Sequence, residues 1–361
     1  MARNRIQTGP PAPSAPGGAS PGAADAPSPP ALPGSGRLDR LVETARGYAA
    51  DAVAPATRAA YASDWAQFEA WCHRQGAAPL PPSPELVGLY LSDCAGSDGA
   101  GHCVATLERR LSGIAWTCRQ RGLAFDRQDR HVAAVMAGIR RRHARPPAQK
   151  AAVSAEDLAA MLGTLGHDLR GLRDRSMLLV GFAAGLRRSE LVALDRGPDQ
   201  SDDLPRGAGW VEIHAPLGLV LHVPGKTGWR EVEVAAGARR RTCPLHALQA
   251  WLDHARLDRG ALFRAISRDG ARVLDRRLGD RHVARLVQRT AAAAGLGSDL
   301  PEAVRRGLYG GHSLRAGLAS HAEADERHVQ KQLGHASVEM TRRYQRRRDR
   351  FRVNLTRAAG L

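Results

Sequence analysis

The chain has 361 residues, enough for two domains that each bury a core of their own. Its 53 Lys and Arg residues outnumber its 36 Asp and Glu residues, which gives a formal charge of +17. Such a charge favours a polyanionic partner. Charge alone is also compatible with a basic protein that has no role on nucleic acid. No apolar run is long enough to span a membrane, and scattered cysteines without a Cys-x-x-Cys pair indicate reduced thiols and a cytoplasmic protein.

The start of the chain predicts a disordered tail. Residues 1–36 are rich in Pro, Ala, Gly and Ser and show no hydrophobic periodicity, so they cannot bury a core. A helical periodicity begins at Arg37, and residues 37–143 predict a small all-helical domain.

Start and stop signals set the expected bounds of these helices. The first should end before Pro55, and Thr57 should cap the second. The apolar stripe of the second helix predicts a packed core rather than a platform for stacking bases. Ser83, followed by Pro84 and Glu85, is typical of the start of the third helix. The stripe of the second helix consists of Tyr61, Trp65, Phe68, Trp71 and Cys72.

A run of arginines ends this helical domain. Arg140, Arg141 and Arg142 are followed closely by Arg145 and by two prolines. Such a run is usually a solvated face. Here it adjoins a break that predicts an interdomain linker over residues 144–153, so contact of these arginines with DNA phosphates is the second interpretation.

A second domain is expected over residues 154–345, followed by a tail over residues 346–361. Ser154 and Asp157 resemble a capping box at its start. Helical periodicity dominates this domain, so the fold as a whole is predicted to be mainly α. Its helices are expected over residues 172–184 and 187–194, and from Pro244 and Asp280 onward.

Between these helices the period changes to that of strands. The stretch 195–209 is polar and rich in Gly, Pro and Asp, which is typical of a loop. Alternating Val, Ile and Leu residues on both sides of a Pro-Gly-Lys-Thr-Gly segment predict a small antiparallel β-sheet, with Lys226 at a turn.

Side chains with complementary chemistry follow one another along the second domain. Arg187 and Arg315 suit the non-bridging oxygens of a phosphodiester, since guanidinium groups pair with phosphate in a planar, bidentate way. Cleavage without a metal also needs a nucleophile and an acid that protonates the departing 5′ oxygen. The candidate catalytic residues are Arg187, Lys226, His312, Arg315, His335 and Tyr344, supported by Glu190.

Each candidate has its own expected role. Tyr344 suits the nucleophile, and Lys226, one of only three lysines in the chain, suits the acid. His312 suits the base that activates the tyrosine, and His335 can add a donor to the phosphate. Glu190 lies on the same helical face as the first arginine and could orient it. Taken singly, each residue has a simpler structural interpretation, but their combination in this order favours a catalytic site.

The order of these motifs resembles that of the tyrosine recombinases, also called the phage integrase family. In that family, Gly-Leu-Arg-x-x-Glu-Leu, a hairpin Gly-Lys, His-x-x-Arg and Leu-Gly-His segments precede the nucleophilic tyrosine. The resemblance covers the second domain in detail, whereas the first is similar to the family's core-binding domain only in size and helix content. The matching segments lie at 185–191, 225–226, 312–315 and 333–335, before Tyr344.

This resemblance implies a site-specific DNA recombinase or integrase that cuts and rejoins double-stranded DNA through a 3′-phosphotyrosine bond, for a mobile element. It implies no metal or other cofactor, no membrane partner, and a homotetramer assembled on recombination sites. Two alternatives stay open: a non-catalytic DNA-binding protein of the same fold, and a type IB topoisomerase-like enzyme that relaxes DNA.

Overall fold

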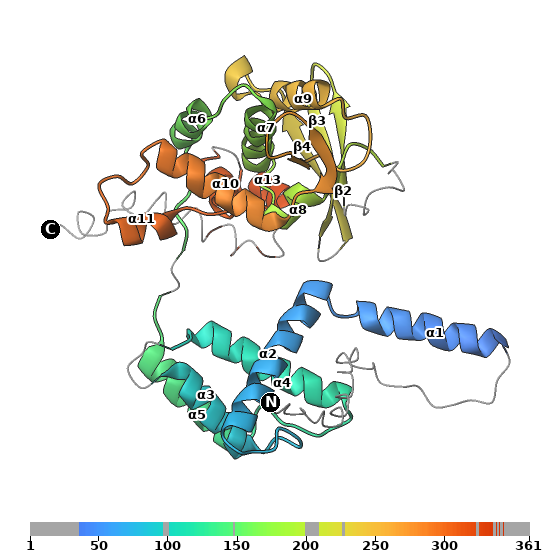
Figure 1. The fold of residues 1–361 in the computed structure, drawn as a ribbon, viewed down its shortest axis with the longest axis vertical. Coiled ribbons are helices and arrows are strands. Elements are labelled where there is room, and N and C mark those ends of the chain that lie inside the picture. Colours follow the sequence, from blue (N-terminus) through green and yellow to red (C-terminus); the bar gives the residue numbers. More distant parts are fainter. Residues whose placement is uncertain are drawn as a thin grey trace, which may run out of the picture. The chain divides into compact units, whose positions relative to one another are not determined.

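The computed structural model describes residues 36–96, 101–146, 149–198, 209–225, 228–322 and 325–334, together with the single residues 337, 339 and 342. The chain divides into two compact units, Met1–Pro147 and Ala148–Leu361 (Figure 1). The tail predicted over residues 1–36 lies outside the described residues, except that Gly36 begins the first helix. Among the described helices, none combines the length and apolar composition that a membrane span requires.

Helices alone build the described part of the first unit. They are α1 (Gly36–Asp51), α2 (Pro55–Arg74), α3 (Pro84–Ala95), α4 (Val104–Gln120) and α5 (Arg130–His143). Helix α2 packs along α4, and α3 packs along α5, so their buried faces enclose one core. Phe68, Tyr90 and Ile114 lie in that core, each at most 1% exposed. The predicted core role of the aromatic stripe is confirmed, because Trp65 and Trp71 are buried beside Phe68.

One predicted helix start in this unit is right and one is wrong. Ser83 caps α3, because its hydroxyl accepts a hydrogen bond of 3.1 Å from the backbone N–H of Leu86. Thr57 does not cap α2, which begins at Pro55 with Ala54 in the cap position. Proline suits the first helical position, because its fixed φ fits the helix and its missing N–H would have no partner there.

The second unit combines helices with small sheets. Its helices are α6 (Ala155–Gly163), α7 (Leu169–Ala183), α8 (Arg188–Ala193), the 3₁₀ turn η1 (Arg240–Thr242), α9 (Pro244–Ala255), α10 (Asp280–Ala293), α11 (Glu302–Leu308), α12 (Ser313–His321) and α13 (Glu326–Leu333). The capping box predicted at the start is present. The Ser154 hydroxyl accepts from the N–H of Asp157 at 3.0 Å, and the Asp157 carboxylate accepts from the N–H of Ser154 at 2.9 Å.

The larger sheet of this unit has the strand order β1-β2-β3-β4. Its strands are β1 (Leu194–Asp195), β2 (Gly209–His214), β3 (Gly218–Gly225) and β4 (Gly228–Ala235). Strands β2, β3 and β4 pair antiparallel, as the alternating pattern predicts. Strand β1, which runs parallel to β2, and strand β5 (Arg264–Ile266) are too short to show a period of two in the sequence. Strand β6 (Val273–Arg277), which pairs with β5, does not alternate in burial. The predicted mainly α fold with a small sheet is confirmed.

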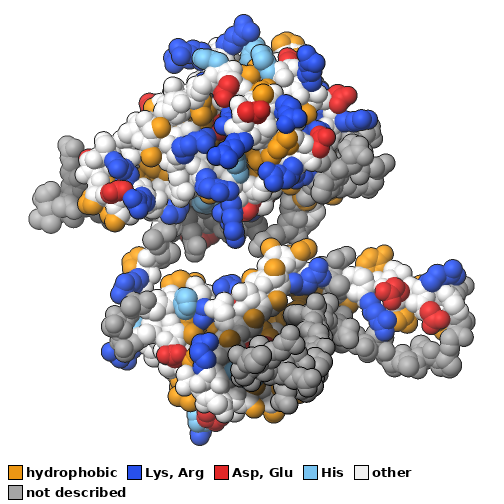
Figure 2. Space-filling model, in the orientation of Figure 1, with side chains coloured by type: hydrophobic (Ala, Val, Ile, Leu, Met, Phe, Trp, Pro, Cys, Tyr) orange, Lys and Arg blue, Asp and Glu red, His pale blue; other side chains and the backbone are white. Residues whose placement is uncertain are grey.

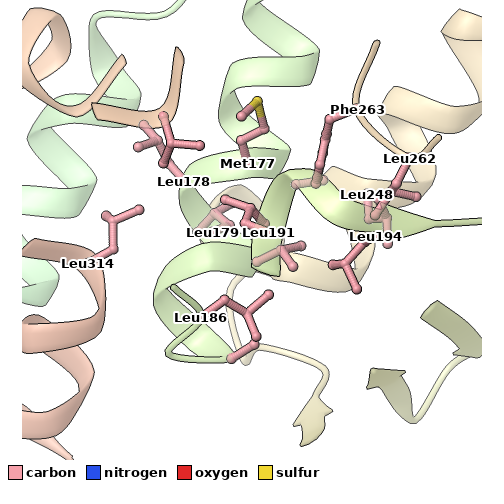
Figure 3. Close-up of a cluster of buried hydrophobic side chains, with 14 of the residues drawn as sticks. Met177, Leu178, Leu179, Leu186, Leu191, Leu194, Leu248, Leu262, Phe263 and Leu314 are labelled. Carbon is pink, nitrogen blue, oxygen red and sulfur yellow. The ribbon is translucent and has the colours of Figure 1, made fainter. Parts of the chain in front are cut away.

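Helix α7 forms the centre of the second unit's core. Helix α9 packs along it, and α12 also contacts it. Figure 3 shows Met177, Leu178 and Leu179 of α7 among buried side chains that include Leu248 of α9 and Leu314 of α12. Each of these side chains is at most 3% exposed, and burying one contributes roughly 1.5–3 kcal/mol. Leu314 therefore anchors the turn of α12 that also carries Arg315.

Helix α12 lies unusually close to the segment that enters the second unit. The N–H of Val153 donates to the carbonyl of Ser313 at 3.1 Å. A Cβ atom at Gly317 would lie 2.2 Å from the Val153 carbonyl oxygen and 2.7 Å from the Phe182 ring. The absence of a side chain at Gly317 therefore allows this approach, which fixes the helix that carries Arg315 and directly follows His312.

Replacing Gly317 by alanine should destabilise the second unit by about 1–3 kcal/mol, the usual cost of overpacking, even though alanine is the better helix former. Urea unfolding of the full chain would measure the change. Gly163→Ala is the matched control, because no atom lies within 4 Å of the position of its added Cβ. Equal stability of both variants would contradict the close packing of α12.

Candidate active site

Arg315 is a buried arginine that connects three segments far apart in the sequence. It lies on α12 with only 1% of its surface exposed. Its Nη1 atom donates to the carbonyl oxygen of Gly185 at 2.7 Å, and its Nη2 atom donates to the carbonyl oxygen of Leu333 at 2.6 Å. A buried guanidinium group needs such acceptors, since its N–H groups have lost water. The side chain thus holds the turn before α8 and the end of α13 against α12.

Glycine is required at the turn that Arg315 holds. Gly185 has a φ of +59°, in the left-handed region. A Cβ atom there would lie 2.6 Å from Leu333 and 2.8 Å from Leu318, so a side chain would also push α13 away. The tight turn lets α7 end and α8 begin within a few residues, which leaves Arg187 in the cap position of α8.

Arg187 is oriented by Glu190, as the sequence predicts. The Glu190 carboxylate accepts from the Arg187 side chain at 2.6 Å and from the Arg187 backbone N–H at 2.8 Å. Burial alone would raise the pKa of Glu190, but hydrogen bonds from Arg230 and from Arg187 outweigh it and hold that pKa below its ordinary value. Glu190 is therefore ionised, and it holds the backbone N–H and the guanidinium group of Arg187, whose side chain is still partly exposed to solvent.

Arg230, on β4, is a member of this cluster that the sequence reasoning missed. It donates to Glu190 at 2.9 Å and 3.3 Å, and its side chain is only 12% exposed. A Cβ atom at Gly334 would lie 2.9 Å from the Arg230 side chain, so Arg230 also supports the residue that precedes His335. The alternation of side chains along a strand could have identified it, because Arg230 lies on the same inward face of β4 as the buried Val232 and Val234.

His312 lies beside both candidate phosphate-binding arginines. It precedes α12 and is exposed, although protein groups around its ring shield part of it from water. Burial lowers the pKa of His312, and the positive charges of Arg315 and then Arg187 lower it further. The imidazole is therefore neutral at neutral pH, which is the form that can accept a proton.

Three predicted catalytic residues, Lys226, His335 and Tyr344, lie outside the described residues. The structure describes only their neighbours. Gly225 of β3 pairs with Gly228 of β4 on either side of residue 226. Gly334 ends α13 in the left-handed conformation, with a φ of +60°.

The arginine run predicted to contact DNA belongs to the first unit. Arg140, Arg141 and Arg142 lie in the last turn of α5, and Arg145 follows it. All four are exposed, and Arg140 forms an ion pair of 2.8 Å with Glu108. They are therefore accessible to a polyanion. They belong to a different unit from Arg187, His312 and Arg315, which lie in the second unit.

The chemistry of this cluster suits an anion rather than a metal. Across the described ranges, no group of three or more His, Cys, Asp or Glu residues could hold a metal ion. Two guanidinium groups and a neutral imidazole lie together, and a negative carboxylate fixes one guanidinium from behind. Such an arrangement can bind a phosphate and stabilise charge that builds on its oxygens.

Known proteins resemble the chain in both sequence and fold. A family model described as the phage integrase family matches residues 152–350. An integrase/recombinase xerD homolog of Selenomonas ruminantium is 30% identical over 310 residues, which cover 82% of this chain and 83% of that protein. Tyrosine recombinase XerC 1 of Ralstonia nicotianae is 34% identical over 209 residues, which cover 54% of this chain and 55% of that protein.

A solved structure is similar to the chain in fold. A lambda integrase dimer bound to a COC′ core site matches with a TM-score of 0.50 and 18% sequence identity. The match covers 88% of this chain and 95% of that chain.

Replacing Glu190 by glutamine should destabilise the second unit by about 3 kcal/mol at neutral pH, because Arg230 would stay buried without a carboxylate. The folded-state pKa of Glu190 is lowered, so its stabilising effect is complete above the unfolded-state pKa and is lost as the pH falls through the folded value. Urea unfolding at a series of pH values should therefore show the two proteins converging in acid.

The control for this experiment is Glu302→Gln. Glu302 pairs with Arg306 at an exposed site, so its loss should change the free energy of unfolding by less than about 1 kcal/mol. If the free energies of unfolding of the wild type and of Glu190→Gln differ by the same amount down to acid pH, the ionised carboxylate is not the stabilising form.

Proposed function

The chain belongs to the phage integrase family, the tyrosine recombinases, and we propose that it cuts and rejoins DNA through a covalent bond between Tyr344 and a 3′ phosphate. It is a site-specific DNA recombinase, and its partners are DNA recombination sites. The observation that carries the proposal is the convergence of Arg187, His312 and Arg315, with Glu190 behind them.

The proposed reaction follows from the charges of this cluster. Arg187 and Arg315 hold the non-bridging oxygens of the scissile phosphate, where negative charge builds in the transition state. Neutral His312 takes the phenolic proton as the oxygen of Tyr344 attacks phosphorus. The bond from phosphorus to the 5′ oxygen breaks, and Lys226 gives that oxygen a proton.

The covalent intermediate explains how the strands are rejoined. The phosphotyrosine keeps the energy of the broken phosphodiester, so a 5′ hydroxyl can attack it and release Tyr344 without an external energy source. His335, which follows the segment supported by Arg230 and Arg315, adds a donor to the same phosphate.

DNA binding is proposed for both units. Residues 37–143 would form the core-binding domain, with Arg140, Arg141, Arg142 and Arg145 on backbone phosphates, and residues 154–345 would form the catalytic domain. Exchange of strands between two recombination sites calls for four active sites, so we propose a homotetramer on DNA. Action on a mobile element's DNA in the cell would place the protein in the cytoplasm.

Tyr344→Phe should bind target DNA as the wild type does but form no covalent adduct, because only the nucleophilic oxygen is lost. An SDS gel of protein incubated with a nicked target duplex would show the adduct. Tyr309→Phe is a control, since Tyr309 lies outside the proposed site. A covalent band from Tyr344→Phe would mean that another residue is the nucleophile.

Lys226→Arg should bind DNA but cleave ordinary DNA more slowly by roughly two to four orders of magnitude, because a guanidinium keeps its proton and cannot act as the acid. A substrate with sulfur in place of the bridging 5′ oxygen has a leaving group that needs no proton. The variant and the wild type should cleave that substrate at nearly equal rates. Failure of the sulfur substrate to rescue the variant would assign Lys226 a positioning role instead.

A further inference from the structure

A second basic site lies in the second unit, apart from the catalytic cluster. The end of α6, the start of α7, η1 and α9 surround a hollow of about 640 Å³. Leucine and alanine side chains form part of its lining, including Leu162 and Ala247. Its charged and polar lining includes Arg175, Arg240, Arg241, His246 and His254.

Helix α7 separates this hollow from the proposed active site. Arg175 lies in the N-terminal half of α7, whereas Gly185 follows its C-terminus. The stretch of helix from Arg175 to Ala183 is about 12 Å long, at 1.5 Å per residue. Basic and histidine side chains gather at the top of this unit in Figure 2, over the part of the chain where Figure 1 shows α9. A phosphate in the hollow therefore cannot be the one that the catalytic cluster holds.

Some arginines of the second unit are paired with carboxylates. Arg230 and Arg264 each form an ion pair with a carboxylate. Within the described part of the chain, no such pair is formed by Arg175, Arg240 or Arg241, and Asp253 lines the same hollow without pairing with them. The positive charges in the hollow are thus available to an anion.

The arrangement of Arg175 supports this conclusion. Its Nη2 atom donates to the carbonyl oxygen of Leu162 at 2.9 Å, which fixes the guanidinium group in the wall of the hollow. Burial, and then the positive charge of Arg241, lowers the pKa of Arg175. Two guanidinium groups that repel each other would be stabilised by a bound anion between them.

We propose that this hollow binds a phosphate-bearing ligand other than the scissile phosphate. Guanidinium groups hold phosphate in a bidentate manner, and the apolar lining suits the sugar or base attached to it. A free nucleotide and the backbone of DNA outside the cleaved site share this chemistry. The proposal does not depend on the assignment of Tyr344 or Lys226.

The test compares two double variants that remove the same charge from the full-length protein. Arg240→Ala with Arg241→Ala empties the hollow of two exposed arginines, and Arg268→Ala with Arg272→Ala removes two exposed arginines near β5 and β6 as the control. Calorimetry with ATP probes the free nucleotide. Anisotropy of a random-sequence duplex over a salt series probes the DNA backbone.

The site takes a free nucleotide if ATP affinity falls roughly tenfold or more in the hollow variant alone, since one charge-assisted hydrogen bond contributes about that factor. It takes DNA if duplex binding weakens in the hollow variant alone and its logarithmic salt slope flattens by about two. The proposal is wrong if the hollow variant and the control behave alike toward both probes.

Two further measurements keep the result interpretable. Thermal unfolding checks the fold of both variants, and Arg241→Gln, which removes the charge that faces Arg175 with less loss of volume, replaces the double variant if that variant unfolds. Covalent adduct formation at saturating target DNA should be unchanged in the hollow variant, because the variant keeps every residue proposed to act in cleavage. Loss of adduct in a folded variant would instead place the hollow in the catalytic process and overturn its assignment as a separate site.

Discussion

The second unit depends on the burial of one charged side chain, Arg315. Its two hydrogen bonds to carbonyl oxygens join the Gly185 turn to the end of α13, which are far apart in the sequence. Burying a guanidinium group is costly unless its donors are satisfied, so the fold places both acceptors where α12 can reach them. Burial, and then the positive charge of this same side chain, lower the pKa of His312, so the imidazole beside the two arginines is neutral.

A chain of charged groups, Arg230 to Glu190 to Arg187, supports the candidate site on the side of the β-sheet. Glu190 holds Arg187 by its side chain and its backbone, and Arg230 holds Glu190. Arg230 also fills the space beside Gly334. The β-sheet thereby contributes to the candidate segments at 185–191 and 333–335, and the hairpin that leads to residue 226 belongs to the same sheet.

Local signals were sufficient for much of the fold and the site. Ser83 and Ser154 cap their helices as predicted, because capping depends on a few neighbouring residues. The pairing of Arg187 with Glu190 was likewise predictable, since both lie on one turn of helix. The start of α2 differs from the predicted cap at Thr57 because Pro55 takes the first helical position, which leaves Ala54 in the cap position.

Other features depend on tertiary contacts and could not be derived from neighbouring residues. The alternation of β4 places Arg230 on the inward face of the strand, but its pairing with Glu190 follows only from the packed structure. The burial of Arg315 follows only from the positions of Gly185 and Leu333. The Arg277 side chain of β6 donates to the backbone carbonyls of Val192 and Leu194, and no sequence period reports such a contact.

Hydrogen exchange of an Arg315→Lys variant tests the central role of this side chain most directly. Lysine keeps the positive charge, but its single ammonium group cannot span two carbonyl oxygens as a planar guanidinium does. Backbone amides at the Gly185 turn and in α13 should then exchange faster together, while those of α9 keep the wild-type rate. Unchanged exchange in both segments, or faster exchange in α12 alone, would contradict the account that Arg315 holds the active site together.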